Sequence, residues 1–83
     1  MRWTLGLMAK AQHASAYRTI PLLLRNMRDE AELTQRELGK RLRKPQSWIY
    51  NCETGNRRVD VSEFIAWVRA CGQDPKLRFE QLL

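Results

Sequence analysis

The side chains best suited to specific chemistry in this sequence are four polar residues placed directly behind a proline. They follow Pro45 as Gln46, Ser47, Tyr50 and Asn51. An amide donates and accepts hydrogen bonds in one plane, and hydroxyl groups do both as well. No nucleophile has a base beside it, and no pair of carboxylates is spaced for acid–base work. The set is therefore suited to recognition by hydrogen bonding and not to catalysis.

Positive charge is concentrated around this polar set. The chain has 83 residues and a formal charge of +6, and seven of its 15 basic side chains lie between Arg36 and Arg58, where only two acidic residues oppose them. Charge gathered in this way favours a polyanionic partner, above all nucleic acid and less often a membrane surface. From charge alone, a solvated basic face without a partner is the alternative.

Other kinds of site have little support in the sequence. Cys52 and Cys71 form no CxxC pair, and the single histidine, His13, stands far from both. We expect both cysteines to be small buried residues of a reduced protein, and we expect no metal and no cofactor. A chain of this length also leaves little room for a substrate pocket, so we expect no enzymatic activity.

The N-terminal residues 1–15 lack clear periodicity and are expected to form an extension of unknown role. They loosely resemble a signal peptide, but Lys10 interrupts the apolar run early. No stretch approaches the ~18 apolar residues that span a bilayer. We therefore expect a cytoplasmic protein with one folded domain at residues 16–83 and no membrane partner.

Helical periodicity and capping residues indicate how the polar set is positioned. The first predicted helix, at residues 16–31, has apolar residues at steps of three and four. Thr34 and Glu37 have the spacing of a capping box, which starts a second helix. Gly39 inside that helix costs about 1 kcal/mol relative to alanine, and it indicates the close approach of another helix.

Three further helices are expected after this one. Pro45 is suited to the first position of a third helix, which should end near Gly55. Asp60 is expected to cap a fourth helix that ends near Gly72, and a short fifth helix follows Pro75. The sequence predicts an all-α fold, a compact bundle of four to five short helices with an N-terminal extension.

The second and third helices, joined by a tight turn, form a helix-turn-helix unit. The major groove of B-DNA is ~12 Å wide and admits one helix, whose leading residues then meet the edges of the bases. Gln46 is the sharpest candidate at that end. Its amide can donate to and accept from one adenine, which gives discrimination of ~1–3 kcal/mol.

The stretch "LTQRELGKRLRKPQSWIYNCETGNRR" resembles the helix-turn-helix of the phage repressor and Cro-like family, also called the Xre family. The likeness runs from about Leu22 to Pro75. Within it, "PQSWI" is similar to the opening of the recognition helix, and "ETGNRRVDVSEF" to the exit loop and fourth helix. The resemblance implies a lambda-repressor-like fold and a sequence-specific transcriptional regulator that binds double-stranded DNA, as a homodimer on two half-sites.

The resemblance also implies roles for individual residues. The base contacts that it implies come from Gln46, Ser47, Asn51 and, in either a base or a backbone role, Tyr50. Gln35 is expected to bond a phosphate, and Arg28 with Glu53 to form a structural ion pair. Further phosphate contacts are expected from the surrounding residues Arg36, Lys40, Arg43, Lys44, Asn56, Arg57 and Arg58.

Two positions depart from the family pattern. Arg43 stands where the family usually has glycine, so a left-handed conformation there would cost ~1 kcal/mol unless the turn takes another shape. Gly39 stands in place of alanine and keeps the side chain small.

Two tryptophans need a place in the fold. Trp48 is expected at the edge of the packing face, as a core anchor and not as a base-stacking group. Val61, Phe64, Ile65 and Val68 outline the fourth helix, and Trp67 is expected beside its apolar stripe of Phe64, Ile65 and Val68. Trp67 could join an exposed apolar patch made with Leu77, Phe79, Leu82 and Leu83. Such a patch marks a subunit contact, unless the tail folds back on its own core.

Other functions stay open at this point. The resemblance allows an antitoxin-type regulator with a toxin as protein partner. A protein-interaction module would use the C-terminal apolar surface. Structure-specific RNA binding would call for aromatic residues exposed on a sheet or groove, and none is evident.

Overall fold

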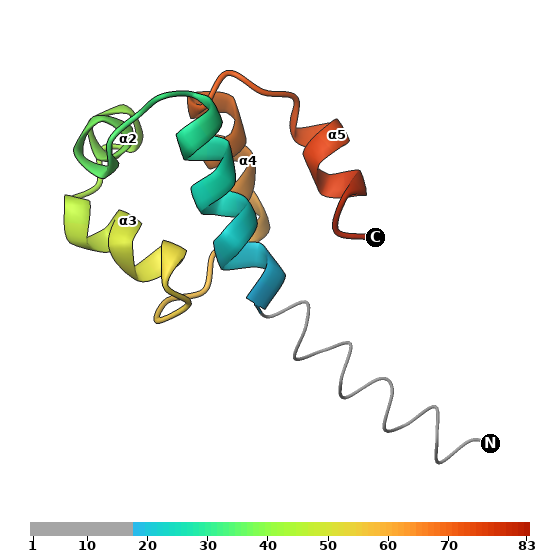
Figure 1. The fold of residues 1–83 in the computed structure, drawn as a ribbon, viewed down its shortest axis with the longest axis horizontal. Helices are drawn as coiled ribbons and strands as arrows, with labels where there is room; N and C mark the ends of the chain where they lie inside the picture. Colours follow the sequence, from blue (N-terminus) through green and yellow to red (C-terminus); the bar gives the residue numbers. More distant parts are fainter. Residues whose placement is uncertain (1–17) are drawn as a thin grey trace, which may run out of the picture.

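The structure is a computed structural model that describes residues 18–83, and the helices of this part are joined by short turns (Figure 1). The first helix spans residues 18–30. It is followed by α2 (Gln35–Leu42), α3 (Gln46–Glu53), α4 (Val61–Ala70) and α5 (Pro75–Glu80). These five helices, with no strand among the described residues, confirm the predicted all-α fold. The expected extension at residues 1–15 and His13 lie outside the described residues.

The predicted capping box starts α2. The Thr34 hydroxyl accepts from the Glu37 backbone N–H at 3.1 Å, and the Glu37 carboxylate accepts from the Thr34 backbone N–H at 2.9 Å. Each group satisfies a donor that the helix leaves unpaired. Asp60 and Glu63 form the same reciprocal arrangement at the start of α4. Both helix starts therefore lie where the sequence placed them.

The turn between α2 and α3 explains the glycine inside α2. A Cβ at Gly39 would lie 2.6 Å from the carbonyl oxygen of Lys44, which is closer than real Cβ contacts come. The closest approach is thus made by the backbone of the turn, and the expected neighbouring helix is also present, since Ile49 of α3 would lie 3.7 Å from the same Cβ. The chain can fold back this tightly because Arg43 takes the left-handed conformation, with φ 56° and ψ 44°.

Pro45 precedes α3 and does not occupy its first turn, contrary to the sequence prediction. Its ψ of 157° is extended, so it is the N-cap residue, and Gln46 is the first helical residue. The Pro45 carbonyl accepts from the backbone N–H of Trp48 at 3.0 Å. After α3 the chain reverses at Gly55, whose φ of 80° suits glycine.

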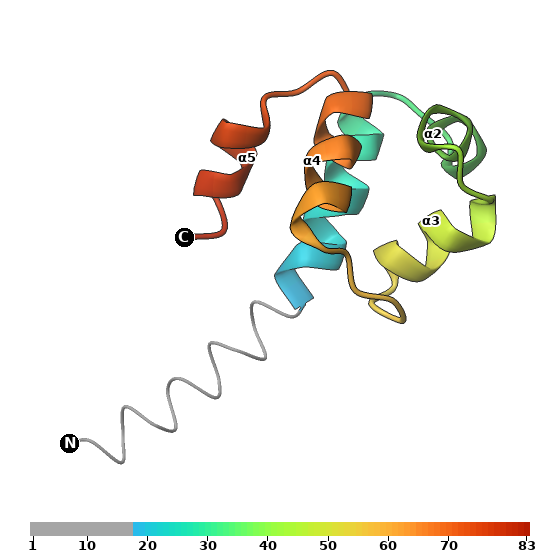
Figure 2. The ribbon, with the colours of Figure 1, turned by 180° about the vertical axis from the view of Figure 1, so that it is seen from behind.

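The core lies where the first helix, α2, α3 and α4 meet. Its most buried members, each less than 2% exposed, are Trp67, Leu24, Met27, Leu38, Ile49, Val68 and Cys52. The first helix and α4 lie together in both views (Figure 2), and the Trp67 indole donates to the Leu24 carbonyl at 3.0 Å. Cys52 and Cys71 are both buried free thiols, as expected.

The expectation for Trp67 was wrong. Trp67 is 0% exposed, whereas Val61, one of the apolar residues that outlined the fourth helix, is 62% exposed. The buried stripe of α4 runs through Phe64, Trp67, Val68 and Cys71. The physical reason is that the first helix covers this side of α4, where the Trp67 indole finds a buried acceptor in the Leu24 carbonyl.

The short helix α5 packs against α4 and leaves apolar side chains in solvent. The rings of Phe64 and Phe79 meet edge to face at 6.1 Å. Arg78 forms an ion pair with Glu30 of the first helix. The exposed members of the predicted patch are Leu77, Phe79 and Leu83, at 61%, 43% and 94% exposure. The patch is therefore smaller than predicted, because Trp67 is absent from it and Leu82 packs against the core.

Candidate nucleic-acid interface

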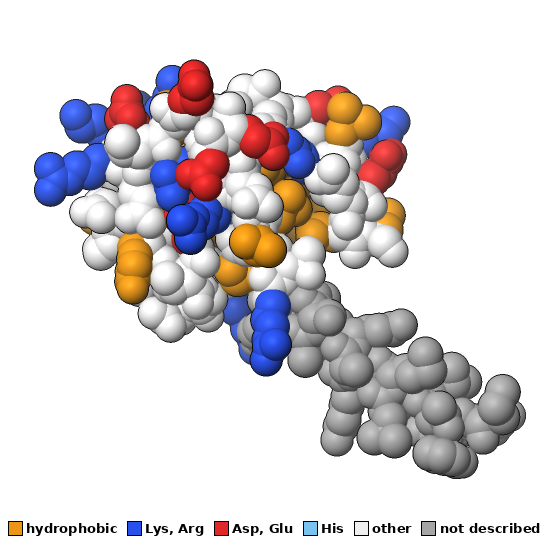
Figure 3. All heavy atoms as spheres, in the orientation of Figure 1, with side chains coloured by type: hydrophobic (Ala, Val, Ile, Leu, Met, Phe, Trp, Pro, Cys, Tyr) orange, Lys and Arg blue, Asp and Glu red, His pale blue; other side chains and the backbone are white. Residues whose placement is uncertain are grey.

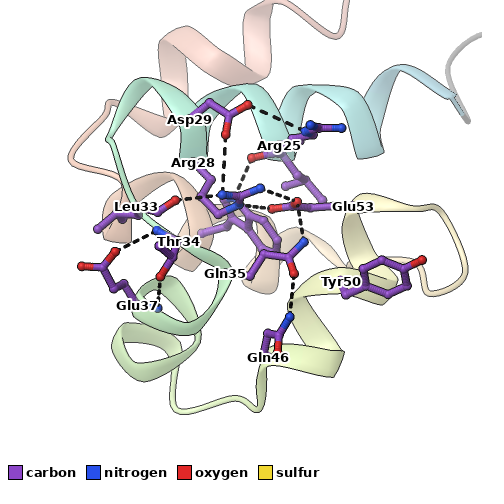
Figure 4. A network of polar contacts seen from close by, with 12 residues as sticks. Arg25, Arg28, Asp29, Leu33, Thr34, Gln35, Glu37, Gln46, Tyr50 and Glu53 are labelled. Atoms are coloured by element: carbon purple, nitrogen blue, oxygen red, sulfur yellow. Dashed lines mark hydrogen bonds and ion pairs between the residues drawn. The ribbon is translucent and has the colours of Figure 1, made fainter.

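The leading residues of α3 present polar side chains to solvent. Gln46 and Ser47 are exposed, and so is Tyr50, at 51%. Tyr50 points away from the polar network in Figure 4, which leaves its ring and hydroxyl accessible. The opposite side of the helix buries Ile49 and Cys52. This division arises because residues three and four apart lie on one face of a helix.

Asn51 is placed differently from its three neighbours. It is half-buried, and its amide oxygen accepts from the Asn56 amide at 3.4 Å. The Asn51 backbone carbonyl also accepts from the Arg57 backbone N–H at 3.1 Å. Asn51 therefore joins α3 to the loop that leaves it, and it stands further from the leading end of the helix than Gln46 does.

A continuous set of hydrogen bonds runs from the exposed Gln46 to the interior (Figure 4). The Gln46 Nε2 donates to the Gln35 Oε1 at 3.0 Å, and the Gln35 Nε2 donates to the Glu53 Oε1 at 3.1 Å. Glu53 is in turn held by Arg28. We call Gln46, Gln35, Glu53 and Arg28 the polar relay. It connects α3, α2 and the first helix.

The inner end of the polar relay is a bidentate ion pair. The Arg28 Nε donates to the Glu53 Oε2 at 2.5 Å, and the Arg28 Nη2 donates to the Glu53 Oε1 at 2.9 Å. The side chains are only 12% and 3% exposed. The hydrogen bond that Arg28 donates to Glu53 raises the pKa of Arg28 above its ordinary value. The remaining guanidinium nitrogen, Nη1, donates to the Leu33 carbonyl at 2.8 Å, so the pair also fixes the turn before α2.

Gln35 is the first residue of α2 and has its amide engaged at both ends within the protein. A phosphate contact from this residue would use the second amide hydrogen or the backbone N–H groups of the first turn, which have no partner within the helix. The sequence did not reveal that the same side chain holds Gln46. The two residues are 11 positions apart and meet only because the turn brings the helix starts together.

Basic side chains flank the polar face. Lys and Arg side chains gather at the end of the molecule formed by α2 (Figure 3). The exposed cations of α2 and the turn are Arg36, Lys40, Arg41, Arg43 and Lys44, and Arg41 among them donates to the Ala70 carbonyl at 2.7 Å. Arg58, in the exit loop, is also exposed. A nucleic acid that lies against α3 would therefore meet cations on both sides of the polar face.

Arg57 has partners within the protein. Its guanidinium bonds both carboxylate oxygens of Glu63, at 3.1 and 3.2 Å, and lies 4.9 Å from the centre of the Trp48 ring. This ion pair lowers the pKa of Glu63 and raises the pKa of Arg57. The sequence predicted Glu63 only as part of a cap, and it gave no sign that Glu63 also orients a basic residue of the exit loop.

Trp48 links the interface to the core. The half-buried ring lies 6.2 Å from that of Trp67 and 5.0 Å from the ammonium of Lys44. The expected role as a core anchor agrees with this position. The two cations on its ring were not foreseen, since the contacts depend on how the turn and the exit loop fold around α3.

The described residues offer little for metal or thiol chemistry. No group of three or more His, Cys, Asp or Glu side chains in this part of the chain could hold a metal ion. Burial raises the pKa of the Cys71 thiol to about 11, so it stays protonated and unreactive near neutral pH. Within the same part of the chain, none of the helices has the length and apolar character needed to cross a membrane.

Comparison with known proteins gives the class and then the family. Residues 22–81 match a family model described as a helix-turn-helix domain. The structure is similar to that of an XRE-family like protein from Pseudomonas syringae pv. tomato str. DC3000, with a TM-score of 0.82 and 37% identity over 90% of this chain and 92% of that one. A search of curated proteins found no match. The chain is a helix-turn-helix protein of the DNA-binding regulator class. It belongs to the Xre family.

Proposed function

We propose that this protein is a sequence-specific regulator of transcription that places α3 in the major groove of double-stranded DNA. The observation that carries the proposal is the exposed leading end of α3, where Gln46 and Ser47 stand in solvent between basic side chains. Amide and hydroxyl tips of this length fit the donors and acceptors of base edges. Tyr50 and Asn51 extend the same face toward the exit loop and complete the proposed set of base-contacting residues.

The proposed phosphate contacts lie on two sides of α3. Before it stand the first turn of α2 and the turn itself, with Gln35, Arg36, Lys40, Arg43 and Lys44. Behind it stands the exit loop, with Asn56, Arg57 and Arg58. Among these, Arg57 is the one whose orientation is fixed by Glu63, so its contact would need no further ordering of the side chain. Each phosphate that a cation neutralises adds about one unit to the slope of affinity against salt.

We further propose that the protein binds as a homodimer, without enzymatic activity. Two copies of α3 would enter half-sites about one helical turn of DNA apart. The proposed place of action is the cytoplasm.

A selection from random duplexes combined with native mass measurement tests this function. We expect an enriched motif with two related half-sites and a complex of two protein chains on one duplex. If the full chain binds all duplexes equally well at physiological salt, the proposed sequence specificity is wrong. A specific complex that contains one protein chain would refute the dimer and leave base recognition standing.

One observation favours an additional protein partner. Leu77, Phe79 and Leu83 are exposed on and after α5, away from the polar face of α3. Large apolar side chains that stay exposed on one element occur at contacts between proteins. This surface has two candidate occupants. One is another protein, as in an antitoxin-type regulator or an interaction module, and the other is the second copy of this chain in the homodimer. Native mass measurement of a Leu77→Ser, Leu83→Ser variant separates the cases, because loss of the dimer assigns the surface to a second copy.

A further inference from the structure

The buried ion pair and the exposed glutamine are the two ends of one chain of hydrogen bonds. We propose, on the basis of the function proposed above, that Glu53 is a positioning residue for base recognition. Acting through Gln35, it fixes which way the Gln46 amide faces, and this makes the position read by Gln46 prefer adenine to guanine. Arg28 and Glu53 would then determine specificity as well as stability.

The first step is the orientation of Gln35. Glu53 is held by Arg28 through both oxygens and is only 3% exposed, so its carboxylate cannot turn away into solvent. An ionised carboxylate accepts hydrogen bonds and donates none. The Gln35 group that lies 3.1 Å from the Glu53 Oε1 must therefore be the NH₂ and not the carbonyl. The Gln35 carbonyl oxygen is then directed to Gln46.

The second step passes this orientation to Gln46. The Gln35 oxygen can only accept, so the Gln46 group at 3.0 Å must be its NH₂. One of the two Gln46 amide hydrogens is used in this contact. The other hydrogen and the carbonyl oxygen remain for an outside partner. The relay thus leaves Gln46 with one donor next to one acceptor on its exposed end.

This exposed pair distinguishes the two purines. Adenine presents an acceptor at N7 and a donor at N6 in the major groove, which match one N–H and one carbonyl oxygen. Guanine presents acceptors at both N7 and O6, so its O6 would face the Gln46 carbonyl oxygen. An amide that is free to turn over could offer both hydrogens to guanine. Preference for adenine therefore depends on the polar relay staying intact.

Gln35→Met tests the proposal without touching the ion pair. Methionine has a similar length but no amide, and the Glu53 Oε1 keeps its bond from Arg28 at 2.9 Å. In a random-duplex selection with the full chain, we expect the ratio of adenine to guanine at the Gln46 position to fall about fivefold or more. Loss of a Gln35 phosphate contact would weaken all duplexes alike and leave that ratio unchanged.

Two further variants complete the experiment. Glu53→Gln replaces the acceptor by an amide that can face either way, and we expect the same relaxed preference. Glu63→Gln is the matched control, because it makes the same chemical change in the ion pair with Arg57 and lies outside the polar relay. It should keep the wild-type ratio. Melting temperatures measured in parallel identify any variant that fails to fold.

The outcomes separate this inference from the function on which it depends. The Gln46→Ala variant identifies the base pair that Gln46 reads, because the preference for one base is lost at that position of the duplex. If that loss occurs and Gln35→Met keeps the wild-type ratio of adenine to guanine, the relay proposal is overturned while base reading stands. If Gln46→Ala changes no base preference at any position, base reading by Gln46 fails and the relay proposal fails with it.

Discussion

At the scale of single residues, Gln46 has both properties that a base-reading side chain needs. Its amide is exposed at the start of α3, and it is held at 3.0 Å by Gln35, so little rotamer entropy remains to be lost on binding. Ser47 is exposed beside it without a bond of this kind among the contacts described above. We therefore expect Gln46 to contribute most to the choice of base.

Two alanine substitutions separate base reading from phosphate contact. On the preferred duplex, Gln46→Ala should cost ~1–3 kcal/mol of binding free energy and relax the choice of base at one position. Arg58→Ala should weaken binding to all sequences equally and reduce the salt slope by about one. Titration of matched and mismatched duplexes at several salt concentrations measures both. Equal losses on all duplexes for both variants would contradict the assignment of Gln46.

The sequence revealed these residues better than it revealed their contacts. Gln46 could be found because its position behind Pro45 is a local feature. The hydrogen bond from Gln46 to Gln35, the ion pair between Arg57 and Glu63, and the position of Arg57 over the Trp48 ring could not be found from the sequence. They join side chains that meet only after the turn and the exit loop have folded.

At the scale of elements, the turn between α2 and α3 sets the position of α3. Its tightness depends on Gly39, which lets the Lys44 carbonyl approach, and on Arg43, which adopts φ 56°. The sequence drew attention to both residues, since glycine is unfavourable within a helix and arginine is unusual at a left-handed position. It could not tell which backbone atoms come close.

We expect Gly39→Ala to destabilise the protein despite the better helix propensity of alanine. The new Cβ would lie 2.6 Å from the Lys44 oxygen, so the backbone of the turn would have to move. The propensity gain of about 1 kcal/mol is smaller than the cost of overpacking, and the net loss should be about 1–2 kcal/mol. Urea unfolding measures it. An unchanged or increased stability would show that the turn can relax.

Arg43→Gly should have opposite effects on stability and on binding. Glycine adopts the left-handed conformation without the ~1 kcal/mol cost that arginine bears, although its greater freedom in the unfolded chain offsets part of the gain. We expect a slightly higher melting temperature together with weaker, less salt-dependent binding to DNA. Lower stability of the glycine variant would mean that the Arg43 side chain makes a stabilising contact that outweighs the strain.

At the scale of the whole molecule, one ion pair holds three elements together. Arg28 of the first helix bonds Glu53 of α3 and the carbonyl of Leu33 before α2. Packing alone leaves helices some freedom to slide, whereas a bidentate pair with little exposure fixes their register. The family resemblance indicated this pair from the sequence. The wider burial of α4, with Trp67 at its centre, depends on the packing of several helices and was not foreseen.

Glu53→Ala should lower the free energy of unfolding by about 2–4 kcal/mol, because it leaves the poorly exposed Arg28 without its partner. The double substitution Arg28→Met, Glu53→Leu should recover part of this loss, since no buried charge is then left unpaired. Thermal unfolding of the three proteins makes the comparison. A single variant as stable as the wild type would contradict the structural role of the pair.

Carboxylates at the helix starts should make the fold sensitive to acid. The pKa of Glu37 is lowered by its hydrogen bond with the Thr34 backbone N–H, and the pKa of Asp60 by its hydrogen bond with the Glu63 backbone N–H. The Arg57 guanidinium lowers the pKa of Glu63. The ordinary values are 4.5 for glutamate and 3.8 for aspartate. Because the folded values are depressed, their contribution is present at pH above these values and is lost as pH falls below them. We expect stability measured by urea unfolding to decline below about pH 5 and to change little between pH 6 and 8. A flat profile from pH 6 to pH 3 would contradict this.

The most direct test of the central claim, that Gln46 reads the edge of a base in the major groove, replaces one nitrogen of the DNA by a C–H group. The selected duplex is made with 7-deazaadenine at the position that loses its preference in Gln46→Ala, which deletes the N7 acceptor and preserves base pairing. The wild-type protein should bind this duplex about tenfold more weakly than the normal one, whereas Gln46→Ala should bind both duplexes equally. Equal affinity of the wild-type protein for the two duplexes, or the same loss in both proteins, would contradict the claim.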